Sequence, residues 1–463
     1  MSTARYAGRS GITERRSPAV PLVVVLVAVV VVVAACGSGD TKNGTAAKTT
    51  SSSSGGGDIA SIVANDPLAG KVGGGLTRGA SGDTIRVGCV YTADAYAGAD
   101  DGYKARFERV NREGGIHGRK IDFSGCQDDG ANTQQNLQIA RRLVEQDKVF
   151  AVMSASANIL SGTTDYLGQK EVPYYGWGFT PGFCGDRWGF GFSGCLIGDA
   201  LKDDVPHAVA QGNLADTGIK ASGLLAPQVK VAVQGGDDDA GHAGNSQYHT
   251  VYEDRGATVA YDEANMPVPG PPADYSPFVR AVLDAKPNLV IASLNFQSTP
   301  GLVAALEAAG YSGTTINAVT YVPGLLARSP QLAKALEGTY VNTQIVPQEE
   351  QTDYIKQIET DLTAIKAKNG TFIPIGAAIA YAQAEMLVEQ LQAVGRDLNT
   401  KTFDEKVNGG DFTFHPKESG GPGKLAFPQG HFLPSDCAAL LKIEKAKYVP
   451  VVPFDCYKSV RVR

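Results

Sequence analysis

The stretch from Thr84 to Ala157 constrains the fold of this chain more than any other part of the sequence. Runs in which apolar residues alternate with polar ones, typical of strands, take turns here with runs at helical spacing. Asn132 is a predicted helix N-cap, with Gln135 three residues further on. Such alternation predicts a parallel sheet with right-handed crossover helices. The predicted elements are a strand at 85–89, a helix over 103–110 that ends at Gly114-Gly115, a strand at 121–126, a helix over 137–144 and a strand at 149–153.

The alternation continues to a fourth predicted strand at 172–177 and then restarts at 230–234. Two successive α/β units are therefore predicted, at residues 83–195 and 196–344. Helices dominate the sequence from 352 to 394, and the tail is rich in Gly and Pro and then apolar. This tail predicts paired strands that close one of the units. The further predicted strands of the second unit are 257–261, 289–292, 316–319 and 340–344.

The composition and motifs exclude several functions. The net charge of −6 and the pI of about 5.6 argue against a nucleic-acid partner, which would require a basic surface. Residues 189–194 match G-x-G-x-x-G, but without a preceding strand or following helix the dinucleotide interpretation lacks its context. Asp237–Asp239 is interpreted as a solvated turn rather than a calcium site. No Ser/His/Asp set can be nominated, so we expect no cofactor, no metal and no enzymatic activity.

The N-terminus has the pattern of an export signal. Arginines precede an almost unbroken apolar run at 19–35, and small residues then lead to Cys36. A single transmembrane anchor is the alternative, although the run is at the short limit for a span. The ending resembles a lipoprotein lipobox, which implies cleavage after residue 35 and a lipid on Cys36. Residues 36–82, rich in Gly, Ser and Thr, predict a flexible linker.

Six cysteines remain after Cys36, an even count that suggests disulfides in an exported chain, although six cysteines allow 15 pairings. Their positions narrow the possible pairings. Two cysteines lie near the ends of the first two strands, two flank an aromatic loop and two flank a terminal hairpin. The predicted pairs are Cys89 with Cys126, Cys184 with Cys195, and Cys437 with Cys456. The aromatic loop between Cys184 and Cys195 is interpreted as a satellite of the core. The cysteine spacing is not that of a zinc site.

From Ile85 to Thr180 the sequence resembles the solute-binding proteins of the branched-chain amino acid type, which are the type I periplasmic binding proteins of ABC transporters. The motifs that carry the resemblance are VNREGGIHGRKIDF, CQDDGANTQQNLQIARRLVEQDKVFAV and VPYYGWGFTP. The stretches GGIHGRK and VEQDKV are the most specific, and KPNLVIASLNF and ALEAAGY fit more loosely. The resemblance covers residues 84–455.

The resemblance implies an α/β fold of two Rossmann-like lobes joined by a hinge of three chain segments. One lobe would comprise residues 83–195 with 345–432, and the other 196–344 with 433–463. A ligand would bind between the lobes and be trapped by hinge closure. This agrees with the rule that open α/β sheets bind ligands beyond the carboxyl ends of their strands.

Loops after the predicted strands supply the candidate ligand contacts. Tyr91 and Tyr96 belong to the loop after the first strand. Asn158 follows the third strand, at the expected start of a helix whose free N–H groups suit a carboxylate. Gly178 and Thr180 match family positions that hold a ligand carboxylate through a backbone group and a hydroxyl. Surface aromatics, caps and turn residues are the simpler interpretation of these positions.

The second unit departs from the family pattern. Asp239-Ala240 matches a place where the family often has a ligand-stacking Tyr, and Phe296 keeps the aromatic type of its position. Thr320-Tyr321 falls where amino-acid binders have an acidic residue that grips the α-amine. No acid stands there, which weighs against an amino acid as the ligand. Asp94 or Asp239 would be the substitutes, although loop Asp residues are more often turn formers.

The sequence therefore predicts a monomeric lipoprotein on the outer face of the cell membrane, which captures a small polar organic molecule for an ABC importer. Its expected partners are that ligand, the permease and ATPase subunits, and the membrane through the lipid anchor. The resemblance makes amino acids the leading ligand class, and amides, urea-like compounds and aromatic acids remain possible. The alternative function is an exported ligand-sensing receptor with the same fold and no permease partner.

Overall fold

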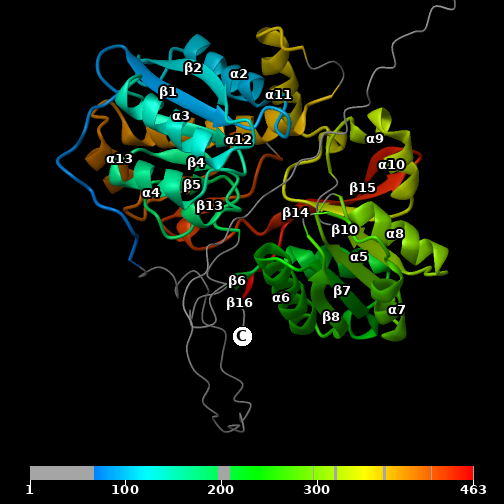
Figure 1. The fold of residues 1–463 in the computed structure, drawn as a ribbon. Coiled ribbons are helices and arrows are strands. Elements are labelled where there is room, and N and C mark those ends of the chain that lie inside the picture. The colour runs from blue at the N-terminus through cyan, green and yellow to red at the C-terminus, as the bar shows by residue number, and fades with distance from the viewer. Residues whose placement is uncertain are drawn as a thin grey trace, which may run out of the picture.

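The computed structural model describes residues 67–196, 209–268, 270–295, 297–317, 321–368, 372–418 and 420–461. The predicted signal peptide, Cys36, most of the predicted linker, Thr320 and Phe296 lie outside these residues, as does the side chain of Asp239. Two sheets, each covered by helices, form two lobes that lie beside each other (Figure 1). We call the lobe that contains β1 lobe 1 and the lobe that contains β7 lobe 2.

The sheet of lobe 1 has five parallel strands in the order β2-β1-β3-β4-β5. The chain leaves β1 toward β2 on one side and leaves β3 toward β4 on the other. The boundary between β1 and β3 is therefore a topological switch point. A crevice beyond the carboxyl ends of the strands at such a point is the usual ligand site of open α/β sheets. The strands are β1 (Thr84–Tyr91), β2 (Lys120–Asp128), β3 (Ala151–Ala155), β4 (Tyr174–Gly176) and β5 (Gly189–Gly191).

Helices cover both faces of this sheet. Helices α2 and α12 pack closely together on one face, while α3 and α4 cover the other (Figure 1). The backbones of α2 and α12 come so near that a Cβ atom on Gly102 would lie 2.3 Å from the carbonyl oxygen of Ala377. The elements of this lobe are α2 (Ala99–Arg112), α3 (Thr133–Glu145), α4 (Ser161–Gln169), η1 (Pro181–Phe183), η4 (Gln348–Glu350), α11 (Asp353–Ala364), α12 (Ile375–Val394), α13 (Thr400–Val407), η5 (Gln429–His431) and the pair β12 (Phe412–Phe414) and β13 (Leu425–Phe427).

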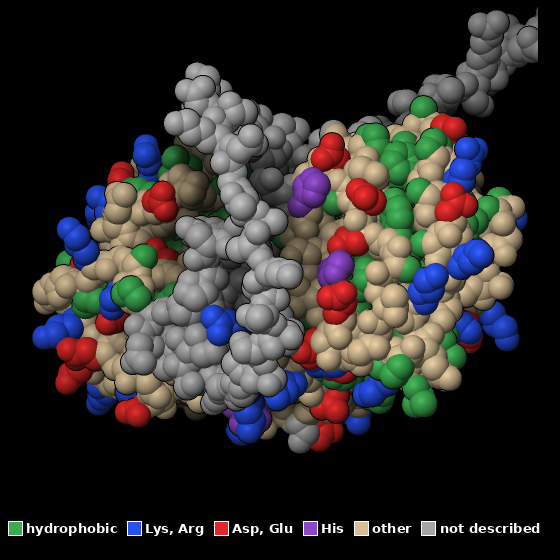
Figure 2. All heavy atoms as spheres, turned by 90° about the horizontal axis from the view of Figure 1, so that it is seen from below, with side chains coloured by type: hydrophobic (Ala, Val, Ile, Leu, Met, Phe, Trp, Pro, Cys, Tyr) green, Lys and Arg blue, Asp and Glu red, His purple; other side chains and the backbone are tan. Residues whose placement is uncertain are grey.

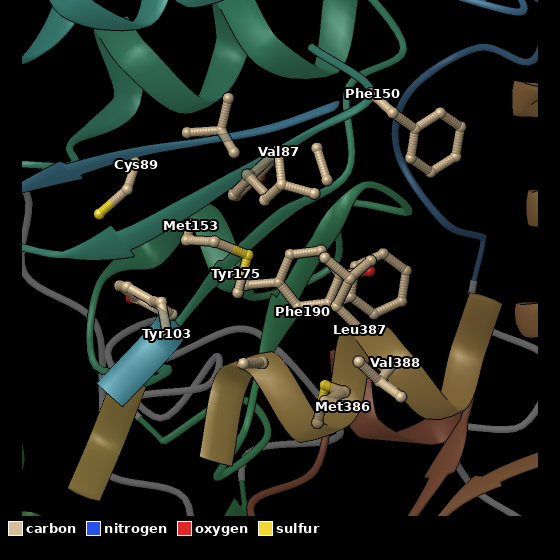
Figure 3. Close-up of a cluster of buried hydrophobic side chains, with 14 of the residues drawn as sticks. Val87, Cys89, Tyr103, Phe150, Met153, Tyr175, Phe190, Met386, Leu387 and Val388 are labelled. Atoms are coloured by element: carbon tan, nitrogen blue, oxygen red, sulfur yellow. The ribbon is translucent and has the colours of Figure 1, made fainter. Parts of the chain in front are cut away.

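The core of lobe 1 lies between the sheet and α12. Figure 3 shows Val87, Met153, Tyr175 and Phe190, from four different strands, directed toward the α12 side chains around Leu387. All five are fully buried. A helix buried around most of its circumference needs few charged residues, and this explains the sequence IGAAIAYAQAEMLVEQLQAV of α12.

Strand β5 was not predicted. The aromatic segment between Cys184 and Cys195 was interpreted as a satellite loop, but Phe190 and its flanking glycines form the fifth strand, parallel to β4. A strand of three residues with two glycines has no apolar alternation to reveal it. The burial of its neighbours Phe183 and Trp188 shows that this segment belongs to the main core.

The sheet of lobe 2 repeats the winding of lobe 1. Its parallel strands have the order β8-β7-β9-β10-β11, and the antiparallel pair β14 and β15 extends the β11 edge. These strands are β7 (Lys230–Gly236), β8 (Thr258–Met266), β9 (Leu289–Ser293), β10 (Thr314–Asn317), β11 (Tyr340–Thr343), β14 (Cys437–Glu444) and β15 (Lys447–Cys456). A small separate pair is formed by β6 (Val209–Ala210) and β16 (Val460–Arg461).

The helices of lobe 2 also divide between two faces. Buried residues of α5 and α6 pack on one face of the sheet, and those of α7, α8, α9 and α10 pack on the other. The predicted terminal hairpin is confirmed as β14 and β15. The helices are α5 (Asn213–Ser222), η3 (Ala226–Gln228), α6 (Asp239–Asp254), α7 (Ser276–Asp284), α8 (Thr299–Ala308), α9 (Leu325–Arg328) and α10 (Pro330–Ala335).

Residues 67–82 differ from the flexible linker that their composition predicts. Leu76 exchanges two hydrogen bonds with Thr400 of α13, both 3.0 Å long. The guanidinium of Arg78 donates to three backbone carbonyls of lobe 1, and Ala69 forms a bridge with Asp186. This segment therefore lies along lobe 1 and leads into β1, as its blue ribbon in Figure 1 shows.

The structure contains the three predicted disulfides. Cys89 and Cys126 are register partners on the neighbouring strands β1 and β2, and Cys437 and Cys456 are partners at the end of the β14–β15 hairpin. The Cys184–Cys195 disulfide closes the segment that contains β5. Each of these links joins positions that the sheet or the loop already brings together.

Charged side chains of both signs are mixed on the surface. Lys and Arg side chains are interspersed with Asp and Glu on the face shown in Figure 2, which has no broad basic area. Among the described residues, no helix has the length and apolar character that crossing a bilayer requires.

Replacement of Phe190 by Ala tests whether β5 belongs to the main core. The Phe190 ring lies 5.3–5.8 Å from the rings of Tyr175, Phe403 and Phe427, so its loss leaves a cavity. We expect the free energy of unfolding to fall by about 3–5 kcal/mol, as measured by urea denaturation. Val451→Ala is the control, because this 43% exposed residue should change stability by only about 0.5 kcal/mol. An equally small effect of Phe190→Ala would contradict the assignment of β5 to the core.

Candidate functional site

A buried carboxylate organises the loops beyond the carboxyl ends of β1, β2 and β3. Asp129, which is 1% exposed, accepts hydrogen bonds from Thr92 Oγ1 at 2.8 Å, Ser156 Oγ at 2.5 Å and Asn136 Nδ2 at 2.9 Å. The backbone N–H of Ala131 donates to the same carboxylate at 3.0 Å. Among the described residues, no cationic side chain forms an ion pair with Asp129. Neutral donors therefore offset the cost of burying this charge, and they fix the loops that carry them.

Asn158 joins this network from the loop after β3. Its backbone N–H donates to Ser156 Oγ at 2.9 Å, and its side-chain amide donates to Thr92 Oγ1 at 3.3 Å. The expectation that Asn158 stands at a helix start is wrong, because α4 begins only at Ser161 with Leu160 as its N-cap. The side chain of Asn158 instead holds the loop close to Thr92.

Tyr91 and Tyr96 lie on the same rim, and both are half-buried. Burial raises the pKa of Tyr91, and the charges of Asp128 and Asp100 raise it further. Burial also raises the pKa of Tyr96, to about 12, with a smaller contribution from the charge of Asp129. Both phenols therefore stay protonated at neutral pH and are able to donate a hydrogen bond to a ligand.

The segment after β4 presents two buried donors. Neither Trp177 Nε1 nor Thr180 Oγ1 has a hydrogen-bond partner within the described residues. Gly178, between them, has φ of +109°, and a Cβ atom there would lie 2.0 Å from the carbonyl oxygen of Gly194. Only glycine fits this position. The rings of Phe179 and Phe192 lie 5.8 and 5.9 Å from the ring of Trp177, so the two donors are set in aromatic surroundings.

Lobe 2 contributes fewer described candidates. Asp239 is the first residue of α6, and Asp238 caps the helix by accepting a hydrogen bond from the N–H of Gly241 at 2.8 Å. Asn295, next to Phe296, accepts hydrogen bonds through Oδ1 from the N–H groups of Gln297 and Ser298. In the chain, Asp239 comes shortly after the carboxyl end of β7, and Phe296 comes shortly after that of β9.

Tyr321 has a partner that sequence reasoning missed. Its hydroxyl donates to Glu349 Oε2 at 2.8 Å and accepts a hydrogen bond from the N–H of Gln348 at 3.0 Å. Its ring packs edge-on against Tyr448 at 5.1 Å. Burial raises the pKa of Glu349. An acid therefore does reach this region, but from the segment after β11 and already bound to Tyr321.

The chain passes between the two lobes at three places, and these passages are hydrogen-bonded to one another. Gln344, just after β11, donates through Nε2 to Gln211 Oε1 at 2.8 Å. Gln211 in turn donates to the carbonyl of Ser435 at 3.3 Å. Asp436, before β14, accepts hydrogen bonds from the N–H groups of Gly212 and Asn213 at 2.9 and 3.0 Å. Residues 197–208 of the first passage lie outside the described residues.

The loops beyond the carboxyl ends of the lobe 1 strands have features of a ligand-binding site. Across the described ranges, no group of three or more His, Cys, Asp or Glu residues has an arrangement that could hold a metal ion. What the rim of lobe 1 offers is fixed neutral donors and aromatic rings beyond a topological switch point. These are typical features of a site for a small organic ligand.

The fold and this rim define a two-lobed solute-binding protein. The sequence matches the family described as "Periplasmic binding protein" over residues 84–447. The chain therefore belongs to the periplasmic binding protein family, with the type I fold of the branched-chain amino acid group of ABC transporter proteins. Proteins of this family are extracytoplasmic, bind small molecules and work with ABC permease and ATPase subunits. A search of curated protein sequences gives no match.

Solved structures share this fold at low sequence identity. A fatty acid ABC transporter substrate-binding protein from Thermomonospora curvata is 17% identical with a TM-score of 0.59, and the match covers 83% of this chain and 95% of that one. A solute-binding protein from R. palustris in complex with 4-hydroxybenzoate is 16% identical with a TM-score of 0.57, covering 82% and 98%. A branched-chain amino acid ABC transporter from Thermus thermophilus with bound valine is 14% identical with a TM-score of 0.58, covering 81% and 97%.

Replacement of Asp129 by Asn tests whether the buried carboxylate fixes the rim. The amide would turn an N–H group toward the donors that now point at a carboxylate oxygen. We expect the free energy of unfolding to fall by about 1–3 kcal/mol, as measured by urea denaturation. Asp122→Asn is the control, since the Asp122 side chain is 59% exposed and 3.9 Å from Arg86. If both variants were equally stable, the carboxylate would not organise the loops.

Proposed function

We propose that this protein is the solute-binding lipoprotein of an ABC importer and that it captures a small carboxylate between its lobes. The observation that carries the ligand class is the pair of unpartnered buried donors, Trp177 Nε1 and Thr180 Oγ1, on the rim of lobe 1. A buried donor without an acceptor costs free energy, and an ionised acceptor satisfies it best. The ligand carboxylate supplies that acceptor.

The ligand lacks a charged amine and has an apolar or aromatic body. Thr320-Tyr321 carries no acid where amino-acid binders grip the α-amine, and Glu349 is already bound to Tyr321. Phe179 and Phe192 supply apolar surface beside the donors. Among similar structures, one is in complex with 4-hydroxybenzoate and another is named for fatty acids, which supports this class, while a third holds valine.

Capture proceeds by closure of lobe 2 over the fixed rim of lobe 1. Asn158, Gly178 and Thr180 bind from lobe 1, with Tyr91 and Tyr96 donating hydrogen bonds. Asp239, Phe296 and Tyr321 bind from lobe 2. The hydrogen-bonded passages at Gln211, Gln344 and Ser435 form the hinge, because small changes there move a whole lobe.

The protein acts as a lipid-anchored monomer outside the cell membrane and performs no catalysis. Cys36 carries the lipid after removal of residues 1–35, and the closed form docks on the permease. The division into residues 83–195 with 345–432 and 196–344 with 433–463 describes the two moving bodies.

Ligand binding by the purified protein tests this function. A ligand that binds only the folded state raises the melting temperature, so we expect benzoate-like or aliphatic acids to raise it and matched amides and amino acids to raise it less. Thr180→Val removes one hydrogen bond to a charged group, a loss of about 1.5–3 kcal/mol. Affinity for the acid, measured by calorimetry, should therefore fall by about 10- to 100-fold.

Thr413→Val is the matched control, because Thr413 is an exposed threonine on β12, away from the rim. Its affinity for the acid should equal that of the unchanged protein. Stronger binding of amino acids than of acids without an amine would overturn the proposed ligand class. An equal loss of affinity in both variants would remove Thr180 from the site.

A further inference from the structure

A second hollow lies at the opposite edge of the lobe 1 sheet from the ligand rim. It has a volume of about 370 Å³ and is lined by the turn before β1, by the start of β1 and by the residue range just before β3. Its lining combines three cationic and three hydroxyl side chains and includes no carboxylate. The lining residues are Thr77, Arg78, Gly79, Ser81, Thr84, Arg86 and Lys148.

The backbone fixes Arg78 at this hollow. Arg78 occupies the turn in which the N–H of Ala80 donates to the carbonyl of Thr77 at 2.9 Å. Gly79 has φ of +69°, and a Cβ atom there would lie 2.3 Å from the backbone nitrogen of Phe150. Only glycine allows the turn to approach the strands this closely. The N–H of Arg86 donates to the carbonyl of Gly79 at 2.7 Å, which ties the turn to β1.

Backbone carbonyls hold the guanidinium of Arg78 in place. No carboxylate among the described residues forms an ion pair with it. It donates to the backbone carbonyls of Val149, Lys170 and Glu171 at 2.9, 3.0 and 3.0 Å. A guanidinium has about five N–H donors, so about two remain for a ligand. The nearest acid, Glu171, uses its carboxylate to accept a hydrogen bond from Thr400 Oγ1 at 2.7 Å.

The other two cations are available as well. Arg86 lies 3.9 Å from Asp122, and both side chains are more than half exposed, so that this ion pair is weak. Lys148 is exposed, and the described residues offer its ammonium no ion-pair partner. Three positive charges thus converge on one hollow without a neutralising carboxylate in its lining.

We propose that this hollow binds a phosphate group. A fixed planar guanidinium, two exposed cations and three hydroxyl groups match the oxygens of a phosphate, which accepts several charge-assisted hydrogen bonds at once. The phosphate belongs either to a free phosphate or small ester, or to the headgroup of an anionic phospholipid. The second source agrees with the position of Arg78, on the segment that leads from the predicted lipid-attachment residue Cys36 into lobe 1. This site is separate from the ligand rim and does not depend on the proposed transport function.

Chemical labelling of Lys148 tests the proposal on the full chain. The protein is acetylated with a limiting amount of reagent in chloride, in inorganic phosphate or in glycerophosphoglycerol, all at equal ionic strength, and each lysine is quantified by mass spectrometry. We expect phosphate to slow the labelling of Lys148 several-fold and to leave that of Lys356, which is 60% exposed on α11, unchanged. Protection by phosphate alone would assign the site to free phosphate or a monoester. Protection by glycerophosphoglycerol as well would assign it to a phosphodiester headgroup.

Two variants make the test specific. Arg86→Gln should abolish most of the protection of Lys148, because Arg86 lines the hollow and its exposed side chain can be replaced without leaving a buried cavity. Arg142→Gln removes the same charge from the exposed surface of α3, outside the lining, and should leave the protection intact. Equal labelling of Lys148 in all three solutions would overturn the proposal. An equal loss of protection in both variants would also overturn it, since the effect would then reflect net charge rather than a site.

Discussion

Within the part of the chain that the structure describes, the buried carboxylate of Asp129 in lobe 1 has no cationic side chain paired with it. The desolvation of Asp129 is offset only if donors from several segments reach it at once. Thr92 and Ser156 come from the loops after β1 and β3, and Asn136 comes from helix α3. The two loops and the helix are thereby fixed relative to one another. The rim is therefore held at fixed positions by its own hydrogen bonds.

The two lobes share one winding but differ in how their edges end. The parallel strands of lobe 1 end at β5, whereas lobe 2 adds the antiparallel hairpin β14–β15 from the end of the chain. The last passage between the lobes therefore leads straight into a strand of lobe 2. Asp436 lies in this passage and accepts hydrogen bonds from the start of α5, so that the passage is tied to a helix of lobe 2.

The sequence was sufficient to predict the strands and helices whose apolar residues recur at a regular spacing. Strand β1, the Asn132 cap and the terminal hairpin each follow from local patterns, and Asn132 Oδ1 accepts a hydrogen bond from the Gln135 N–H as predicted. Strand β5 has too few residues to show a period. The Asp129 network and the Tyr321–Glu349 contact could not be predicted, because they join residues that only the tertiary fold brings together. The only hint of Asp129 in the sequence is the pair of adjacent acids in CQDDG. The structure shows that the first of them, Asp128, is exposed and that the second, Asp129, is buried.

The two ends of the lobe 1 sheet use different donors for a physical reason. At the carboxyl edge, Trp177, Thr180 and the two tyrosines are neutral, and a neutral donor costs less to bury than a charged one. At the amino edge, Arg86 and Lys148 remain hydrated, so that their charges cost little and attract an anion through solvent. A buried arginine at the ligand rim would carry the desolvation penalty of an ion whenever the ligand leaves. The neutral rim therefore suits a protein that must both bind and release its solute.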